Sequence, residues 1–126
     1  MARLFIDCDD TLVLWLGEDG EGDGGPNPYG GGKEKWEPNR ALIAAIESSR
    51  EEYEEVVVWT GGGSDYARVW RDRLLPWAHH AIAKDTRIPG SEDVCVDDAV
   101  LRVAAALLTP QEFIEESRPA PDTEAR

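Results

Sequence analysis

The fold of this chain is decided by residues 4–11, which read LFIDCDDT. The apolar start of this stretch predicts a buried β-strand that delivers carboxylates at its C-terminal end, where open α/β sheets place their chemistry. Successive side chains of a strand alternate between faces, so Asp7 and Asp9 are expected on one side and Cys8 on the other. Because aspartate also favours turns, the stretch alone leaves two interpretations open, a reactive acidic site or an acidic turn.

Length and composition bound the class of protein. The 126 residues have room for one domain with one core, placed at 1–116 with a glycine-rich flap at 17–35, followed by a flexible tail at 117–126. The 13 basic and 26 acidic residues give a formal charge of −13, which disfavours non-specific nucleic-acid binding. Cys8 and Cys95 lie in apolar runs and are expected to be reduced and buried. Without a leader-like segment or a membrane-spanning apolar run, we expect a cytoplasmic protein with no membrane contact.

Short apolar runs alternate with helical patterns along the chain. Apolar side chains recur at helical spacing after Asn39, after Asp65 and over 100–107, and a capping sequence predicts a fourth, short helix after Thr109. Such alternation predicts right-handed crossovers and a mainly parallel sheet with helices on both faces. The expected fold is therefore α/β, a Rossmann-like three-layer sandwich. Its strands are expected at the runs 4–8, 56–59, 81–83 and 94–96.

The long irregular stretch of the sequence lies between the first strand and the first helix. We expect a short turn at 12–16 and then the flap, since loops this long in a compact domain are usually functional or disordered. Residues 19–24 read DGEGDG, like the start of a calcium loop, but Gly30 occupies the position that needs a bidentate glutamate. Trp15 and Trp36 flank the flap, and an anchoring role is favoured over stacking on a substrate base.

The other predicted strands also end in polar groups. The second strand is followed by Thr60 and by the sequence GGGS at 61–64, which predicts an anion seat at a helix N-terminus. It is not a nucleotide-binding P-loop, because the Gly-Lys-Ser/Thr ending is missing. The third strand ends at Lys84 and the fourth at Asp97 and Asp98. Parallel strands bring all of these polar groups to the same sheet edge, which favours one phosphate site over unrelated surface residues.

This ordered set of motifs resembles that of the haloacid dehalogenase (HAD) superfamily of phosphohydrolases. The resemblance extends from the first predicted strand to the last, and the stretch 36–63 is similar to small uncharacterised members from phages and bacteria. The superfamily's four motifs correspond here, in order, to DCDDT at 7–11, to Thr60, to Lys84, and to Asp97 with Asp98.

The resemblance implies a role for each motif residue. Asp7 would be the nucleophile that takes up the phosphoryl group as an aspartyl-phosphate, and Asp9 would be the acid and base. Thr60 and Lys84 would hold the phosphate oxygens, where charge spreads in the transition state. The amides of Gly61 and Gly62 would complete the phosphate seat. The implied cofactor is Mg²⁺, with ligands from Asp7, the backbone carbonyl of Asp9, Asp97 and the neighbouring Asp98.

The implied activity is that of a Mg²⁺-dependent phosphatase acting on phosphomonoesters. Neither 11–38 nor 60–84 has room for the cap domain that many superfamily members carry, so the resemblance implies an open site. The net charge favours a phosphorylated small molecule or nucleotide over bulk nucleic acid, with a nucleic-acid end as a further candidate. Two alternatives stay open: a receiver-like module, which would carry its acidic pair and acceptor on separate strands, and an inactive phosphate-binding relative, which would not need Asp9.

Overall fold

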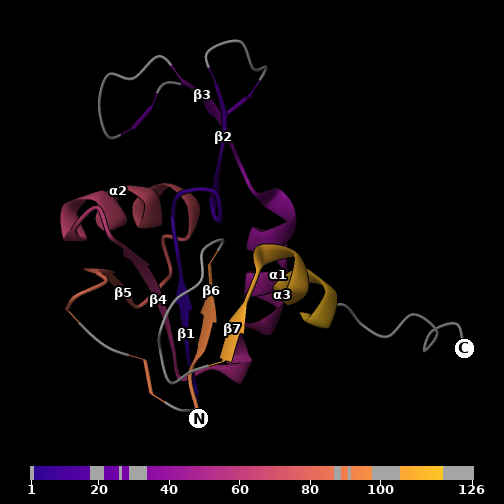
Figure 1. The fold of residues 1–126 in the computed structure, drawn as a ribbon. Helices are drawn as coiled ribbons and strands as arrows, with labels where there is room; N and C mark the ends of the chain where they lie inside the picture. Colours follow the sequence, from indigo (N-terminus) through magenta and orange to yellow (C-terminus); the bar gives the residue numbers. More distant parts are fainter. Residues whose placement is uncertain are drawn as a thin grey trace, which may run out of the picture.

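A central parallel sheet organises the molecule in the computed structural model, which describes residues 2–17, 22–25, 27–28, 34–86, 89–90, 92–97 and 106–117 (Figure 1). Five strands follow the order β5-β4-β1-β6-β7, and every neighbouring pair is parallel. The predicted α/β class with a mainly parallel sheet is confirmed. The strands of this sheet are β1 Arg3–Ile6, β4 Glu55–Thr60, β5 His80–Ala83, β6 Val94–Val96 and β7 Ala106–Leu108.

The apolar runs form the centre of the sheet because β1 has strands on both sides. Leu4 pairs with Val56 of β4 and with Val94 of β6. Alternate residues of β1 therefore point into different cores, with Leu4 and Ile6 in one cluster and Phe5 in the other. All three of these side chains are fully buried. A strand buried on both faces needs a continuous apolar run, and this is the pattern in the sequence.

Three helices pack on the face of the sheet that carries Leu4 and Ile6. They are α1 Arg40–Ser49, α2 Ser64–Leu74 and α3 Pro110–Ser117, and a short 3-10 turn, η1 Arg50–Glu52, follows α1. The Asn39 side chain accepts a hydrogen bond from the Leu42 N–H and caps α1. The three helices bury side chains in one core cluster with β1, β4 and β6. These side chains are Leu42 and Ile46 from α1, Ala67 and Trp70 from α2, and Phe113 and Ile114 from α3.

The opposite face of the sheet carries a smaller cluster of Phe5, Val57, Trp59 and Cys95. The sequence predicted helices on both faces of the sheet, with a helical pattern at 100–107. Residues 98–105 lie outside the described part of the chain, and 106–108 form strand β7. The helical prediction is therefore wrong for residues 106 and 107, because a short apolar run has no period that separates a strand from a helix.

An antiparallel hairpin stands beyond the carboxyl ends of the sheet (Figure 1). It pairs β2 Val13–Gly17 with β3 Lys35–Pro38, so the short turn predicted at 12–16 is wrong. Trp36 explains how the hairpin is held: it is 2% exposed and packs edge-on against Trp70 of α2 at 4.8 Å. Its indole N–H donates to the Gly25 carbonyl. Trp36 therefore anchors the loop, as favoured, and is too deeply buried to stack on a substrate.

The remaining predictions concern the flap, the tail and the cysteines. Of the flap at 17–35, only residues 17, 22–25, 27–28 and 34–35 are described, and Gly24 donates to the Trp36 carbonyl. Of the tail at 117–126, only Ser117 is described, as the last residue of α3. Cys8 and Cys95 are buried and free of disulfides, as predicted. Within the described chain, none of the helices has the length and hydropathy needed to cross a membrane.

Candidate active site

Strand order singles out one point at the carboxyl edge of the sheet. The chain leaves β1 toward β4 and β5 on one side, whereas β6 leads to β7 on the other. Open α/β sheets bind ligands where the direction of the connections reverses in this way. Asp7 directly follows β1 and Asp97 directly follows β6, so two aspartates flank this point. Their position is fixed by the backbone, because the Asp7 N–H donates to the Val96 carbonyl and the Asp97 N–H to the Leu108 carbonyl.

Lys84 bridges the two aspartates. Its Nζ atom lies 2.6 Å from Asp97 Oδ2 and 3.2 Å from Asp7 Oδ1. The Lys84 N–H donates to the Thr60 carbonyl, which extends the pairing of β4 with β5 by one step and aims the side chain along the sheet edge. The structure thus brings together three of the residues predicted for the site, Asp7, Lys84 and Asp97.

Asp7, Asp97 and Lys84 carry two carboxyl groups for one ammonium, and the pKa values of Asp7 and Lys84 are shifted. Burial and the nearby Asp97 carboxylate raise the pKa of Asp7 from 3.8 to about 7, although Lys84 acts in the opposite direction. Burial alone would lower the pKa of Lys84, but its hydrogen bonds and charge interactions with Asp97 and Asp7 outweigh burial and raise it. Two carboxylates therefore share one ammonium, and the burial of the second negative charge at Asp7 is not fully compensated.

A further cation fits this arrangement. Mg²⁺ prefers oxygen ligands and is usually bound through one or two carboxylates together with several waters. Asp7 and Asp97 supply two carboxylates, and the raised pKa of Asp7 shows that added positive charge would be stabilising there. Among the described residues, no group of three or more His, Cys, Asp or Glu side chains is placed to hold a metal ion. Asp98, the fourth predicted ligand, lies outside the described residues.

Asp7 and Asp9, which flank Cys8 in the turn after β1, have different hydrogen-bond partners. The N–H groups of Thr11 and Val13 both donate to the Cys8 carbonyl, and the buried Thr11 hydroxyl donates to Asp7 Oδ2 over 3.3 Å. Asp9 is half-buried and lies against aromatic donors, as described below. Asp10, which follows Asp9 and is exposed, adopts a left-handed backbone with φ of 57°, which aspartate tolerates better than most residues.

The predicted phosphate seat lies beside Lys84. Thr60 is 2% exposed, and its Oγ1 accepts a hydrogen bond from the Gly62 N–H. Gly63 precedes α2 with φ of 103°, a conformation that residues with a side chain rarely adopt. The Gly62 amide is therefore committed to Thr60, whereas the prediction reserved it for a ligand. A hollow of about 340 Å³ opens here, lined by Gly61, Gly62, Gly63, Ala83, Lys84 and Asp85.

Two contacts of Asp9 were not anticipated from the sequence. The Trp15 indole N–H donates to Asp9 Oδ1 at 2.9 Å, and the Tyr66 hydroxyl donates to the same oxygen at 2.6 Å. Trp15 comes from β2 and Tyr66 from the first turn of α2. A tyrosine near a helix start carries no signal of such a contact, because sequence spacing does not show which strand end the helix faces.

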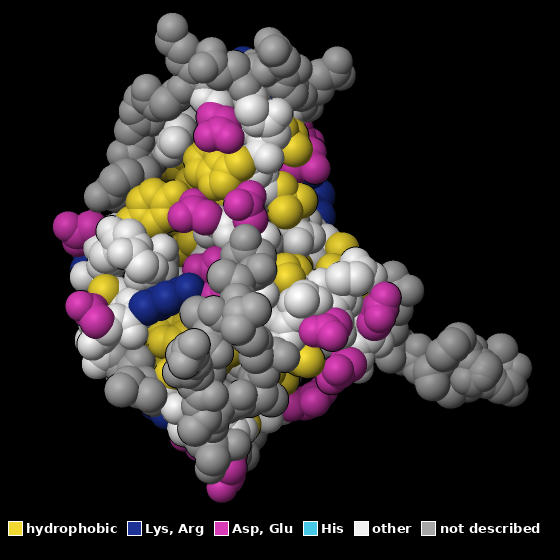
Figure 2. Space-filling view, in the orientation of Figure 1, with side chains coloured by type: hydrophobic (Ala, Val, Ile, Leu, Met, Phe, Trp, Pro, Cys, Tyr) yellow, Lys and Arg dark blue, Asp and Glu magenta, His cyan; other side chains and the backbone are white. Residues whose placement is uncertain are grey.

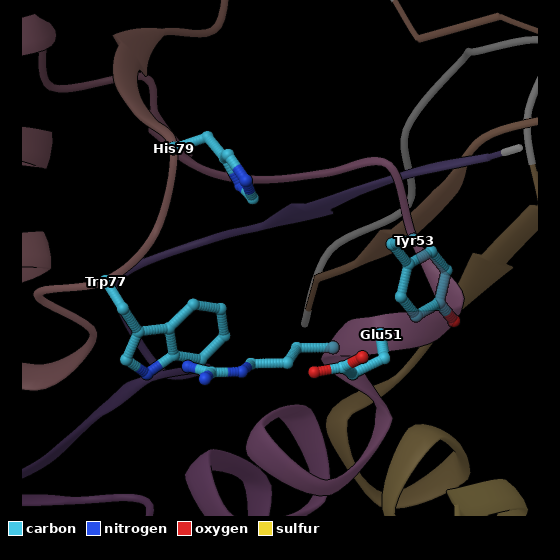
Figure 3. A pocket seen from close by; sticks show the side chains of 5 residues that line it. Glu51, Tyr53, Trp77 and His79 are labelled. Atoms are coloured by element: carbon cyan, nitrogen blue, oxygen red, sulfur yellow. The ribbon is translucent and has the colours of Figure 1, made fainter.

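A second hollow lies away from the carboxyl edge, near the start of β4 (Figure 3). Its volume is about 350 Å³, and Arg50, Glu51, Tyr53, Trp77 and His79 line it. The Arg50 guanidinium stacks over the Trp77 ring at 4.8 Å, and His79 Nδ1 accepts the Val56 N–H. The cation and the imidazole thus already have intramolecular partners, whereas the buried charge of Asp7 is not fully compensated, so the carboxyl edge is the better candidate site.

Acidic side chains outnumber basic ones on the surface of the molecule. Figure 2 shows Asp and Glu side chains spread over the described part of one face, with few Lys or Arg among them, in keeping with the net charge of −13. Comparison with known proteins does not assign the chain to a family: no protein-family model matches it, and neither does any curated protein or solved structure. The functional argument therefore depends on the residues themselves.

Proposed function

We propose that this chain is a HAD-type phosphatase that hydrolyses phosphomonoesters through an aspartyl-phosphate formed on Asp7. The observation that carries the proposal is the convergence of Asp7, Lys84 and Asp97 at the switch point of the sheet, beside the glycine loop after Thr60. A buried carboxylate next to an ammonium can act as a nucleophile while the ammonium neutralises the phosphoryl oxygens.

The proposed reaction has two displacements. In the first, an Asp7 carboxylate oxygen attacks phosphorus, the bond from phosphorus to the ester oxygen breaks, and Asp9 gives its proton to the leaving oxygen. In the second, Asp9 takes a proton from water as the water oxygen attacks the phosphorus of the aspartyl-phosphate, and the bond from phosphorus to the Asp7 oxygen breaks. Inorganic phosphate leaves, and both aspartates return to their starting states.

The remaining residues would bind and neutralise the phosphoryl group. Lys84 and the Thr60 hydroxyl would contact its oxygens from the side of the 340 Å³ hollow, with the backbone N–H of the exposed residue Gly61 beside them. Asp7, the Asp9 carbonyl and Asp97 would hold Mg²⁺, with Asp98 as a further candidate ligand. When bound, the ion would neutralise negative charge shared by the phosphate and the two carboxylates.

The acidic surface favours a small substrate. A net charge of −13 repels long polyanions, so we propose a phosphorylated metabolite, a nucleotide or a nucleic-acid end over bulk nucleic acid.

Asp7→Asn tests the proposal. Wild-type protein with Mg²⁺ should release inorganic phosphate from an aryl phosphate over many turnovers, and the variant should lose this activity by at least about 10³-fold. Asp10→Asn removes a neighbouring exposed carboxylate and is the matched control, expected to retain turnover. Multiple turnovers separate a phosphatase from a receiver-like module, which would accept one phosphoryl group, and from an inactive binder. Full activity in Asp7→Asn would overturn the nucleophile assignment.

A further inference from the structure

The carboxyl group of Asp9 is held by two donors from separate elements. Trp15 Nε1 lies 2.9 Å and Tyr66 Oη 2.6 Å from the same atom, Asp9 Oδ1. Trp15 is six residues from Asp9 along the chain, whereas Tyr66 is 57 residues away on α2. Two donors that meet on one oxygen fix the plane and rotation of the carboxyl group better than either donor alone.

Both donors are themselves rigidly supported. The rings of Trp15 and Tyr66 pack edge-on against the fully buried Trp70, at 6.0 Å and 6.3 Å between ring centroids. Trp36, the anchor of the hairpin, also packs edge-on against Trp70. The positions of Trp15 and Tyr66 are therefore set by the aromatic core, and Asp9 has little freedom to move away from them.

The two hydrogen bonds hold one carboxyl oxygen of Asp9 and leave the other to face a ligand. Both hydrogen bonds go to Oδ1, and no described residue donates to Oδ2. Tyr66 is held as a neutral donor, because burial and the bond to Asp9 raise its pKa above the usual range.

We propose that Tyr66 and Trp15 are positioning residues that orient Asp9, so that its Oδ2 faces the leaving oxygen in the first displacement and the attacking water in the second. This inference rests on the proposed phosphatase function and extends it to two residues outside the motif set. Neither residue touches the substrate in this proposal, since each acts only through Asp9.

Tyr66→Phe provides the test, because it removes the hydroxyl and keeps the ring against Trp70. A good leaving group such as 4-nitrophenolate needs no proton, whereas a simple alkoxide does. We expect kcat/KM, which reports the first displacement and not the hydrolysis step that both substrates share, to fall about 10- to 100-fold for an alkyl phosphate and less than about threefold for 4-nitrophenyl phosphate. Tyr53→Phe, which removes a hydroxyl far from Asp9, is the matched control and should leave both rates unchanged.

A double variant gives a second readout. If Tyr66 acts only through Asp9, Tyr66→Phe should reduce the alkyl phosphate rate little further in an Asp9→Asn background. Trp15→Phe should show the same dependence on the leaving group, which covers the case in which Tyr66→Phe misfolds. An equal loss for both substrates, or additive losses in the double variant, would overturn the positioning role alone. A wild-type protein inactive on both substrates would overturn the phosphatase proposal itself, and the positioning role with it.

Discussion

Metal-free protein should lose stability as the pH rises through the titration of Asp7, and Asp7→Asn should remove this loss. The pKa of Asp7 is raised from 3.8 in the unfolded chain to about 7 in the folded protein, first by burial and then by Asp97. The folded state therefore holds this proton more tightly than the unfolded chain does between about pH 4 and pH 7. Unfolding in that window releases a proton, so stability decreases as the pH rises.

The size of the effect follows from the shift in pKa. At 1.36 kcal/mol per unit, deprotonation of Asp7 lowers the free energy of unfolding by about 4 kcal/mol between pH 4 and pH 8. Asparagine has nearly the same shape as the protonated acid and no proton to lose. We expect Asp7→Asn to match wild type within about 1 kcal/mol near pH 4.5, and to exceed it by a few kcal/mol at pH 8.

Urea unfolding in the presence of a chelator, at intervals from pH 4.5 to pH 8, measures this difference. Asp10→Asn makes the same change in net charge at an exposed position and corrects for the general effect of one negative charge fewer. Added Mg²⁺ should then stabilise the wild type at pH 8 more than Asp7→Asn, because binding to the folded state alone raises its stability. A difference that does not vary with pH would refute the argument from burial, and equal stabilisation by Mg²⁺ would refute the placement of the ion at Asp7.

Three further predictions concern Lys84, Gly62 and Trp36. Lys84→Met should abolish phosphate release and lower stability by about 2 kcal/mol at pH 8, but less at pH 5 where Asp7 is protonated, as measured by urea unfolding. Gly62→Ala should reduce turnover, measured as phosphate release from an aryl phosphate, because its Cβ would lie 3.2 Å from the Tyr66 ring. Trp36→Ala should lower the free energy of unfolding by about 3–5 kcal/mol, and a loss below 1 kcal/mol would contradict the anchoring role.

Most of the central sheet could be predicted because its signal is local. The runs around residues 4–6, 56–59 and 94–96 are continuously apolar, and only strands buried on both faces require that pattern over so few residues. The hairpin was missed for the opposite reason. Its strands β2 and β3 are separated by the glycine-rich stretch, so no local turn signal links Val13–Gly17 to Lys35–Pro38.

The sequence by itself determined which chemical groups end the strands: Asp7 after β1, Thr60 at the end of β4, Lys84 after β5 and Asp97 after β6. A parallel sheet brings its carboxyl ends to one edge, so their meeting followed from the strand pattern alone. Only the tertiary structure decided which hydrogen-bond and ion-pair partner each of these groups has. Lys84 lies between two carboxylates, the Gly62 amide is taken by Thr60, and Asp9 is held by aromatic residues of the hairpin and α2. These are contacts between distant elements, and their geometry depends on how the helix and the hairpin pack together around Trp70.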